Sequence, residues 1–428
     1  MTSDRLEQAT ARTRARPPRR GRSGGSRSGV LGHPEFRLVF AAAVVSLLGT
    51  QISYVAIPLV AVSALHASPG QVGVLAMLST VAFLLVGLPA GAWVDRLRRR
   101  PVMITADLAR AALLGSVPLA WWIGELSLIQ LYVVVFLTGV CTVFFDVASQ
   151  SYLPHVVGRD RLTAANSALV SADAAGDVVG RGLGGLLVQA LAAPVAVGVD
   201  ALSYLWSAAC LWRIRRRESP PGPGEPTHLW REMNQGLRFV AGRPVLRAIA
   251  LSGALVNLSL QLILTLLPVL FVRDLHLSAQ TLGAYLGAGG IGLFLGARLA
   301  APLGRRLGQG RTPWIVGALL GPAALAIPFV DHGPWLWIAA TAWLLTMAQI
   351  GVNNVILVGF RQRITPDRLL GRVNATMRVL LFGALALGSG LAGLLGQFTG
   401  TRTALWAGAA ILSLAWVPLF CSPLRRDG

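Results

Sequence analysis

Two stretches of this sequence repeat each other: residues 51–73, QISYVAIPLVAVSALHASPGQVG, and residues 261–283, QLILTLLPVLFVRDLHLSAQTLG. Identical residues recur at an offset of 210 positions, where Gln51, Pro58, His66, Ser68 and Gly73 correspond to Gln261, Pro268, His276, Ser278 and Gly283. A second repeat pairs Asp160-Arg161-Leu162 with Asp367-Arg368-Leu369 at an offset of 207. The chain therefore contains two related halves, and equal orientation of the halves places their symmetry axis along the membrane normal.

Apolar segments recur on both sides of these stretches, from Phe36 onward, and each is long enough to cross a hydrocarbon core of about 30 Å. The sequence predicts twelve, at residues 38–64, 72–94, 102–122, 127–148, 164–190, 194–212, 248–272, 280–302, 313–330, 335–359, 374–398 and 403–420. The composition, with 54% hydrophobic and 13% charged residues in 428, lies outside the range of a soluble domain. We expect an all-α membrane protein with twelve transmembrane helices in two pseudo-symmetric six-helix bundles.

This pattern divides the chain into five parts. They are a disordered basic cytoplasmic tail (1–35), an N-terminal bundle (36–213), a cytoplasmic linker with an amphipathic helix (214–247), a C-terminal bundle (248–421) and a cytoplasmic C-terminal tail (422–428). Arginine gathers in alternate loops, which is typical of cytoplasmic loops, so both termini are predicted to be cytoplasmic in a multi-pass inner (plasma) membrane protein. The basic segments favour the lipid bilayer as a partner, and no nucleic acid is expected.

Several classes of function are disfavoured by the residue types present. All 38 basic residues are arginine, and the absence of lysine excludes a phosphate-binding loop of the Walker A type and Schiff-base chemistry. Three cysteines and six scattered histidines form no ligand spacing, so neither a metal nor another cofactor is expected. Without a nucleophile and base at cavity depth, we expect a protein that is not an enzyme.

The loop after the second predicted span has the sequence Gly91-Ala-Trp-Val-Asp95-Arg96-Leu-Arg98-Arg99-Arg100. It resembles the signature G-x-x-x-D-R-x-G-R-R of the major facilitator superfamily, with Arg98 in place of a glycine, and the likeness extends over about residues 36–421. The resemblance implies that Asp95 faces the N-terminal end of the eleventh helix and stabilises an outward-facing state. The predicted gating residues are Gly91, Asp95, Arg96, Arg99, Arg100, Asp107, Arg110 and Asp146. The last three lie near the cytoplasmic ends of their spans, where structural pairing is the favoured alternative.

The fifth span contains Gly176-x-x-x-Gly180-Arg181-x-x-Gly184-Gly185, which resembles the antiporter signature G-x-x-x-G-P-x-x-G-G with Arg181 in place of the proline. Asp173, Asp177 and Arg181 share one helix face near the bilayer midplane. Two carboxylates facing one guanidinium leave one acid unmatched, and such an acid could carry a proton. The alternative is a static bridge between Asp177 and Arg181, joined by Asp200. Asp173, Asp177, Arg181 and Asp200 are the predicted proton-coupling residues.

Gly49-Thr-Gln51, Phe144-Phe145-Asp146 and Asp107-x-x-Arg110 are similar to the superfamily branch of macrolide, siderophore and multidrug exporters, the transmembrane secretion effector type. In this superfamily, helices 1, 4, 7 and 10 line the central cavity. The predicted substrate-cavity residues are Gln51, Tyr54, Asn257, Gln261, Gln349 and Asn353; hydrogen bonding between helices is the alternative. We expect proton-coupled export of an amphiphilic small organic molecule. An importer or uncoupled facilitator, and a non-transporting membrane scaffold or sensor, are the alternatives.

Overall fold

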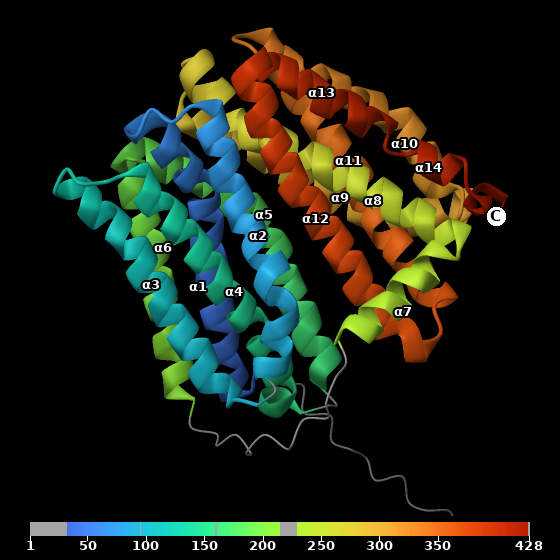
Figure 1. The fold of residues 1–428 in the computed structure, drawn as a ribbon, viewed down its shortest axis with the longest axis horizontal. Helices are drawn as coiled ribbons and strands as arrows, with labels where there is room; N and C mark the ends of the chain where they lie inside the picture. Colours follow the sequence, from blue (N-terminus) through green and yellow to red (C-terminus); the bar gives the residue numbers. More distant parts are fainter. Residues whose placement is uncertain (1–31, 95, 159–160, 215–228, 427–428) are drawn as a thin grey trace, which may run out of the picture.

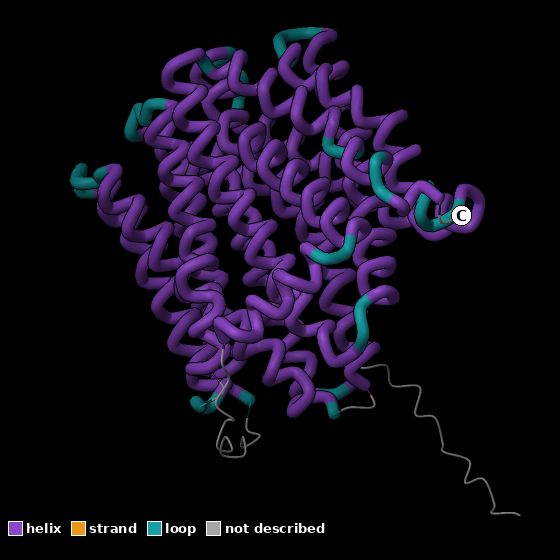
Figure 2. The backbone as a smooth tube through the Cα atoms, turned by 45° about the vertical axis from the view of Figure 1, so that its right-hand side comes forward, coloured by secondary structure: helices purple, strands orange, loops and turns teal. Residues whose placement is uncertain are grey.

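The computed structural model describes residues 32–94, 96–158, 161–214 and 229–426. The described part of the chain is helical apart from short loops and turns, and its helices lie side by side in two groups (Figures 1 and 2). The predicted gating residue Asp95, nearly all of the basic tail and residues 215–228 of the predicted linker lie outside the described residues.

The first half contains α1 (Pro34–Leu59), α2 (Pro69–Val94), α3 (Arg99–Trp122), α4 (Leu128–Val157), α5 (Leu162–Leu191) and α6 (Ala193–Arg213). The second half contains α8 (Pro244–Pro268), α9 (Ala279–Leu307), α10 (Thr312–Leu320) with its 3₁₀ continuation η5 (Gly321–Phe329), α11 (Pro334–Ile364), α12 (Asp367–Thr399) and α13 (Thr401–Leu414) followed by α14 (Val417–Phe420). In the described chain, 11 helices are long and apolar enough to cross a membrane. The 30-residue helix α5, which carries Asp173, Asp177 and Arg181, completes the predicted twelve.

Several helices extend beyond the predicted spans at the end that carries arginine. For example, α11 continues to Ile364 and α12 begins at Asp367, where the sequence predicted 335–359 and 374–398. A span predicted from hydropathy ends too early at such places, because arginine ends the apolar run while the helical backbone hydrogen bonds continue. The linker contributes α7 (Leu229–Ala241), whose Val240 is buried with Leu246 and Val373.

The internal repeat is visible in the backbone. Pro58 lies inside α1, which ends in the π-helical turn η2 (Val60–Ala64), and Pro268 ends α8 before the π-helical turn η4 (Val269–Asp274). Proline cannot donate a backbone hydrogen bond, so the helix widens at both places. His66 and His276 then adopt φ values of 50° and 52°, and reverse the chain into α2 and α9. The sequence repeat therefore specifies the same local geometry twice.

Two glycine contacts join the halves at one end of the bundle. Gly73 of α2 meets Gly393 of α12, and a Cβ atom built on Gly73 would lie 2.7 Å from the Gly393 nitrogen. The equivalent contact in the repeat joins Gly283 of α9 to Gly185 of α5, where a Cβ on Gly283 would lie 2.8 Å from the Gly185 Cα. Only residues without side chains permit this approach. We call this the glycine end, and the opposite end, where α6 stops and α7 begins, the linker end (Figure 1).

Candidate functional site

A cavity of about 400 Å³, which we call the central cavity, lies between the two halves. Its wall combines α1, α2, α3, α4 and α6 with α8, α9 and α12, and most of its lining is apolar. The polar side chains that face it include Tyr54, Asp200, Tyr204 and Gln261. A mostly apolar cavity of this size with a few polar groups suits a small organic molecule.

Asp200 is the only charged residue among the described residues that line this cavity, and its accessible fraction is 1%. The Ser203 hydroxyl donates a hydrogen bond to the Asp200 Oδ1 over 2.9 Å. Gly49 of α1 makes room for this group, because a Cβ there would overlap Asp200 and Ser203. The Tyr204 and Thr50 hydroxyls, 2.8 Å apart, tie the next turn of α6 to α1.

Asp107 and Arg110 form an ion pair on α3 that is buried next to this site, with accessible fractions of 0% and 3%. The guanidinium lies between two rings, with its central carbon 4.1 Å from the Tyr204 centroid and 4.4 Å from the Phe145 centroid. The sequence placed this pair near the cytoplasmic end of its span, where snorkelling would reach water. That placement is corrected, because the two aromatic rings enclose the cation inside the first half.

The charges around Asp200 do not balance. Arg110 lies within electrostatic reach of Asp107, Asp146 and Asp200, and Asp146 also faces Arg378 of α12. Three carboxylates therefore share two guanidiniums. Asp107 holds its cation in contact, whereas Asp200 is hydrogen-bonded to a hydroxyl and has no ion pair among the described residues. The sequence predicted one carboxylate without a matching cation on α5. Asp200 of α6 is a second carboxylate of this kind, and it faces the cavity.

A second polar cluster joins α1 to α5. The Gln51 amide donates to Asp177 and accepts a hydrogen bond from Arg181 Nε over 3.3 Å, and the Arg181 guanidinium lies 3.5 Å from the Asp177 carboxylate. The same guanidinium lies 5.0 Å from the Tyr54 ring centroid. Residues predicted separately for the cavity and for proton coupling are therefore neighbours. Asp200 is not a member of this cluster, which corrects the alternative of a bridge that includes it.

The other predicted cavity residues lie elsewhere. Tyr54 and Gln261 line the cavity between the halves, but Gln51, Asn257, Gln349 and Asn353 do not belong to its lining. The Asn257 amide donates to the Gly253 carbonyl of its own helix over 2.8 Å. Gln349 and Asn353 are buried in α11, with Gln349 against Gly317 of α10. Asp173 is exposed on α5 and lies within reach of Asp146 and Asp177.

Four of the predicted gating residues, Gly91, Arg96, Arg99 and Arg100, lie at the linker end. Arg100 donates hydrogen bonds to the carbonyls of Leu211 and Trp212, over 2.9 and 2.6 Å, and ties the start of α3 to the end of α6. Arg99 lies 3.2 Å from the His155 ring nitrogen of α4. Arg96 is exposed, and no other segment of the described chain lies within 4 Å of where a Cβ on Gly91 would be.

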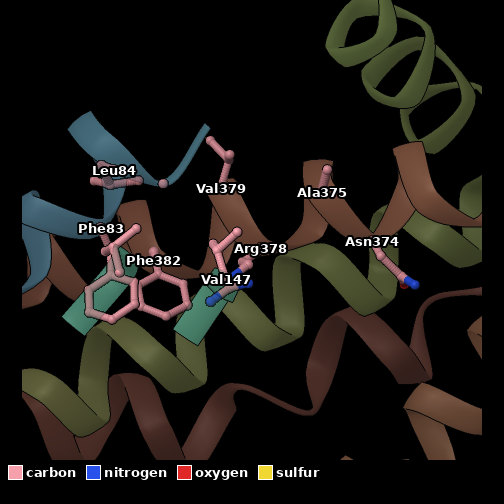
Figure 3. Close-up of a pocket in the computed structure, with 10 residues that line it drawn as sticks. Phe83, Leu84, Val147, Asn374, Ala375, Arg378, Val379 and Phe382 are labelled. Carbon is pink, nitrogen blue, oxygen red and sulfur yellow. The ribbon is translucent and has the colours of Figure 1, made fainter. Parts of the chain in front are cut away.

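A second cavity, of about 310 Å³, lies between α2, α4 and α12 on the linker side of the first (Figure 3). Phe83 and Phe382 line both cavities, and their rings stack across the two halves with centroids 5.1 Å apart. Arg378 and Asn374 face this second cavity. Arg378 is not among the predicted site residues, although an arginine inside the predicted span 374–398 is a signal that could have identified it.

The comparisons with known proteins agree with this architecture. The family model for the Major Facilitator Superfamily matches residues 39–379 and 250–427. The chain belongs to the major facilitator superfamily. Within the superfamily it is 30% identical over 404 residues to the multidrug efflux pump Tap of Mycolicibacterium fortuitum, covering 91% of this chain and 96% of Tap. It is 26% identical to the enterobactin exporter EntS of Salmonella typhimurium, over 85% of this chain and 86% of EntS.

Solved structures show the same fold. A bacterial homologue of the iron transporter ferroportin, in an inward-facing state, matches with a TM-score of 0.74 at 18% identity, over 90% of this chain and 98% of that one. A bacterial homologue of the lysosomal transporter Spinster, also inward-facing, matches with a TM-score of 0.69 at 17% identity, over 92% of this chain and 97% of that one. The superfamily fold and the apolar helices make this chain a multi-pass inner-membrane protein.

Proposed function

We propose that this chain exports amphiphilic small organic molecules, in exchange for protons, by alternating access between its two halves. The cavity between the halves, which is mostly apolar and is also lined by hydroxyl groups, the Gln261 amide and the Asp200 acid, carries the proposal. The relatives that export a drug or a siderophore support the outward direction. Arginine at the linker end supports a cytoplasmic location for that end and for both termini. The proposal includes no enzymatic step, no cofactor and no nucleic-acid partner.

Rocking of the halves about the cavity would move substrate through the bundle. In the described conformation, glycine contacts hold the halves together at the glycine end, and the second cavity lies between them at the linker end. This is the arrangement that would take substrate from the cytoplasm. Separation of Gly73 from Gly393 and of Gly283 from Gly185 would release it on the other side. The predicted gating residues would stabilise closure of the linker end, with Arg99 and Arg100 anchored inside the first half.

Asp200 is the residue that we assign to carry the exchanged proton. A buried carboxylate without a cation in contact is costly, so the folded protein gains by protonating it. Its position on the cavity wall gives the proton a route to whichever side is open. Asp177, by contrast, is hydrogen-bonded to Gln51 and bridged to Arg181, and it lies outside the cavity lining. Asp177 and Arg181 would then hold α5 against α1.

The test uses proteoliposomes with a trapped pH dye and a panel of amphiphilic antibiotics and siderophores. Asp200→Asn and Asp177→Asn make the same change in the two clusters, and Asp331→Asn changes an exposed loop. We expect substrate-evoked proton movement to be lost in Asp200→Asn and retained in the other two variants. Loss of proton movement in Asp177→Asn alone would assign proton coupling to Asp177 on α5. Substrate movement without proton movement in the native chain would leave an uncoupled facilitator, and inward accumulation would indicate an importer.

A membrane scaffold or sensor is the candidate from a different class, because the basic tail and linker could engage partners. Removal of residues 1–30 separates the two. A transporter retains flux without the tail, since the cavity and both halves lie after it. A scaffold would lose its activity with the tail and would show no substrate flux in either form.

A further inference from the structure

The second cavity contains two polar side chains, Arg378 and Asn374, to which the proposed export mechanism gives no role. It is lined by apolar side chains of α2 and α4, by one polar amide and by one cation, Arg378. Arg378 and Asn374 are one turn apart on α12, and Phe382 follows one turn further toward the membrane centre (Figure 3). The three side chains therefore form a file that leads from the linker end to the wall of the central cavity.

Two polar groups in this file lack partners. Arg378 forms no hydrogen bond or ion pair among the described residues, and its guanidinium lies 5.7 Å from the Phe382 centroid. The Asn374 Oδ1 is buried and has no hydrogen-bond partner in the described chain. A guanidinium and an unsatisfied amide oxygen facing one cavity favour a ligand that brings an anionic acceptor together with a hydrogen-bond donor.

The charged residues around Arg378 leave its guanidinium able to bind an anionic ligand. Asp146 of α4 lies within electrostatic reach but outside ion-pair distance, and it also faces Arg110 of α3 and Asp173 of α5. Of the described residues on α2, none is charged near this cavity, and α12 itself carries Arg368 and Arg372 toward the linker end. An anion in the second cavity would thus meet the Arg378 guanidinium, with Asp146 as the nearest carboxylate that Arg378 shares with Arg110.

The aromatic pair adds a second recognition element. Phe83 and Phe382 stack at an interplanar angle of 23° and separate the two cavities. Planar rings attract further rings in offset or edge-to-face arrangements, worth about 0.5–1.5 kcal/mol beyond burial. A ring-bearing molecule in the second cavity can pack on this pair, and it must displace one of the rings to reach the central cavity.

We propose that the second cavity is an entry site that binds aromatic organic anions before they pass to the central cavity. The inference rests on the proposed function, because an entry site at the linker end implies export. It also narrows that function, since it assigns substrates a planar ring and an acidic group. Arg378 binds the acid, Asn374 accepts a hydrogen bond from the ligand, and the Phe83–Phe382 pair holds the ring.

Equilibrium binding to the full chain in lipid nanodiscs tests the site without any transport step. Two fluorescent probes share a ring system and differ by one sulfonate: 1-anilinonaphthalene-8-sulfonate, which is an anion, and the neutral N-phenyl-1-naphthylamine. Empty nanodiscs give the lipid background. We expect Arg378→Gln to weaken binding of the anionic probe about tenfold and to leave the neutral probe unchanged. Phe382→Leu should weaken binding of both probes, because both contain the same ring system.

Arg298→Gln is the matched control, since it removes an exposed guanidinium from α9, away from the cavity. It should leave both probes unchanged, and thermal melting of each variant verifies that the fold is intact. Equal binding of the anion by native protein and Arg378→Gln would overturn the proposal, as would a native preference for the neutral probe. The protein could bind the anionic probe through Arg378 and yet transport no substrate. That result would contradict the proposed export function and would still support the anion-binding site.

Discussion

The glycine contacts between the halves give a prediction that can be worked out from the structure. A Cβ on Gly185 would lie 2.6 Å from the Ala279 carbonyl oxygen and 2.8 Å from the Gly283 Cα. Both are backbone atoms of α9, so they cannot rotate away, and α5 and α9 must separate. For Gly182, on the same helix, no heavy atom of another described segment lies within 4 Å of the Cβ position. Gly185→Ala therefore tests the interface, and Gly182→Ala is its control.

The magnitude follows from the cost of overpacking. Inserting a methyl group into a packed interface costs about 1–3 kcal/mol, whereas the gain in helix propensity from glycine to alanine is the same for both variants and cancels. A penalty of about 2 kcal/mol changes the ratio of conformations with the glycine end closed and open by a factor of about 30. From a starting ratio of about ten to one, the closed fraction falls from about 0.9 to about 0.25.

Cysteine labelling measures this shift. Ala375 lines the cavity at the linker end, so Ala375→Cys in a background without Cys141, Cys210 and Cys421 reports whether that end is open. Gly185→Ala should slow maleimide labelling about 3.5-fold, in proportion to the fraction with the glycine end closed. Gly182→Ala should label at the native rate. Equal labelling rates in the two glycine variants would refute the argument that these contacts hold the conformation.

Three further results are expected. Asp107→Asn should lower stability by about 3–5 kcal/mol, because it leaves the Arg110 guanidinium buried without its partner, and the double variant with Arg110→Gln should melt closer to native. Arg181→Gln should cost less than about 1 kcal/mol, since its bridge to Asp177 is partly exposed; a larger loss of melting temperature would contradict this. In the loop before α11, hydrogen bonds from His332 and from Arg402 hold the pKa of Asp331 below its usual range. The ionised carboxylate therefore stabilises the loop at neutral pH, and the contribution is lost as the pH falls through that lowered pKa. The difference in melting temperature between native protein and Asp331→Asn should shrink below about pH 4, and a difference that grows in acid would show the sign to be wrong.

The sequence alone determined the twelve spans, the two halves and the superfamily. Hydropathy and repeat spacing are local properties of the chain, because a helix in lipid satisfies its own backbone and must be apolar over about 20 residues. The paired motifs at Pro58 and Pro268 fixed even the shape of two helix ends. The charges on α5 were also visible in the sequence, as was the unsatisfied balance between acids and arginines.

Only the tertiary structure decided which polar groups meet. Gln51 and Asp177 are 126 positions apart, and their contact depends on the rotation and depth of two helices, which packing sets and hydropathy does not. The same is true of Asp200, which the sequence joined to α5 and which the structure places beside Arg110 on the cavity wall. Arg378 acquires its surroundings only when α12 packs against α2 and α4. A helix presents each side chain in one direction, and the neighbours that fill that direction come from distant parts of the chain.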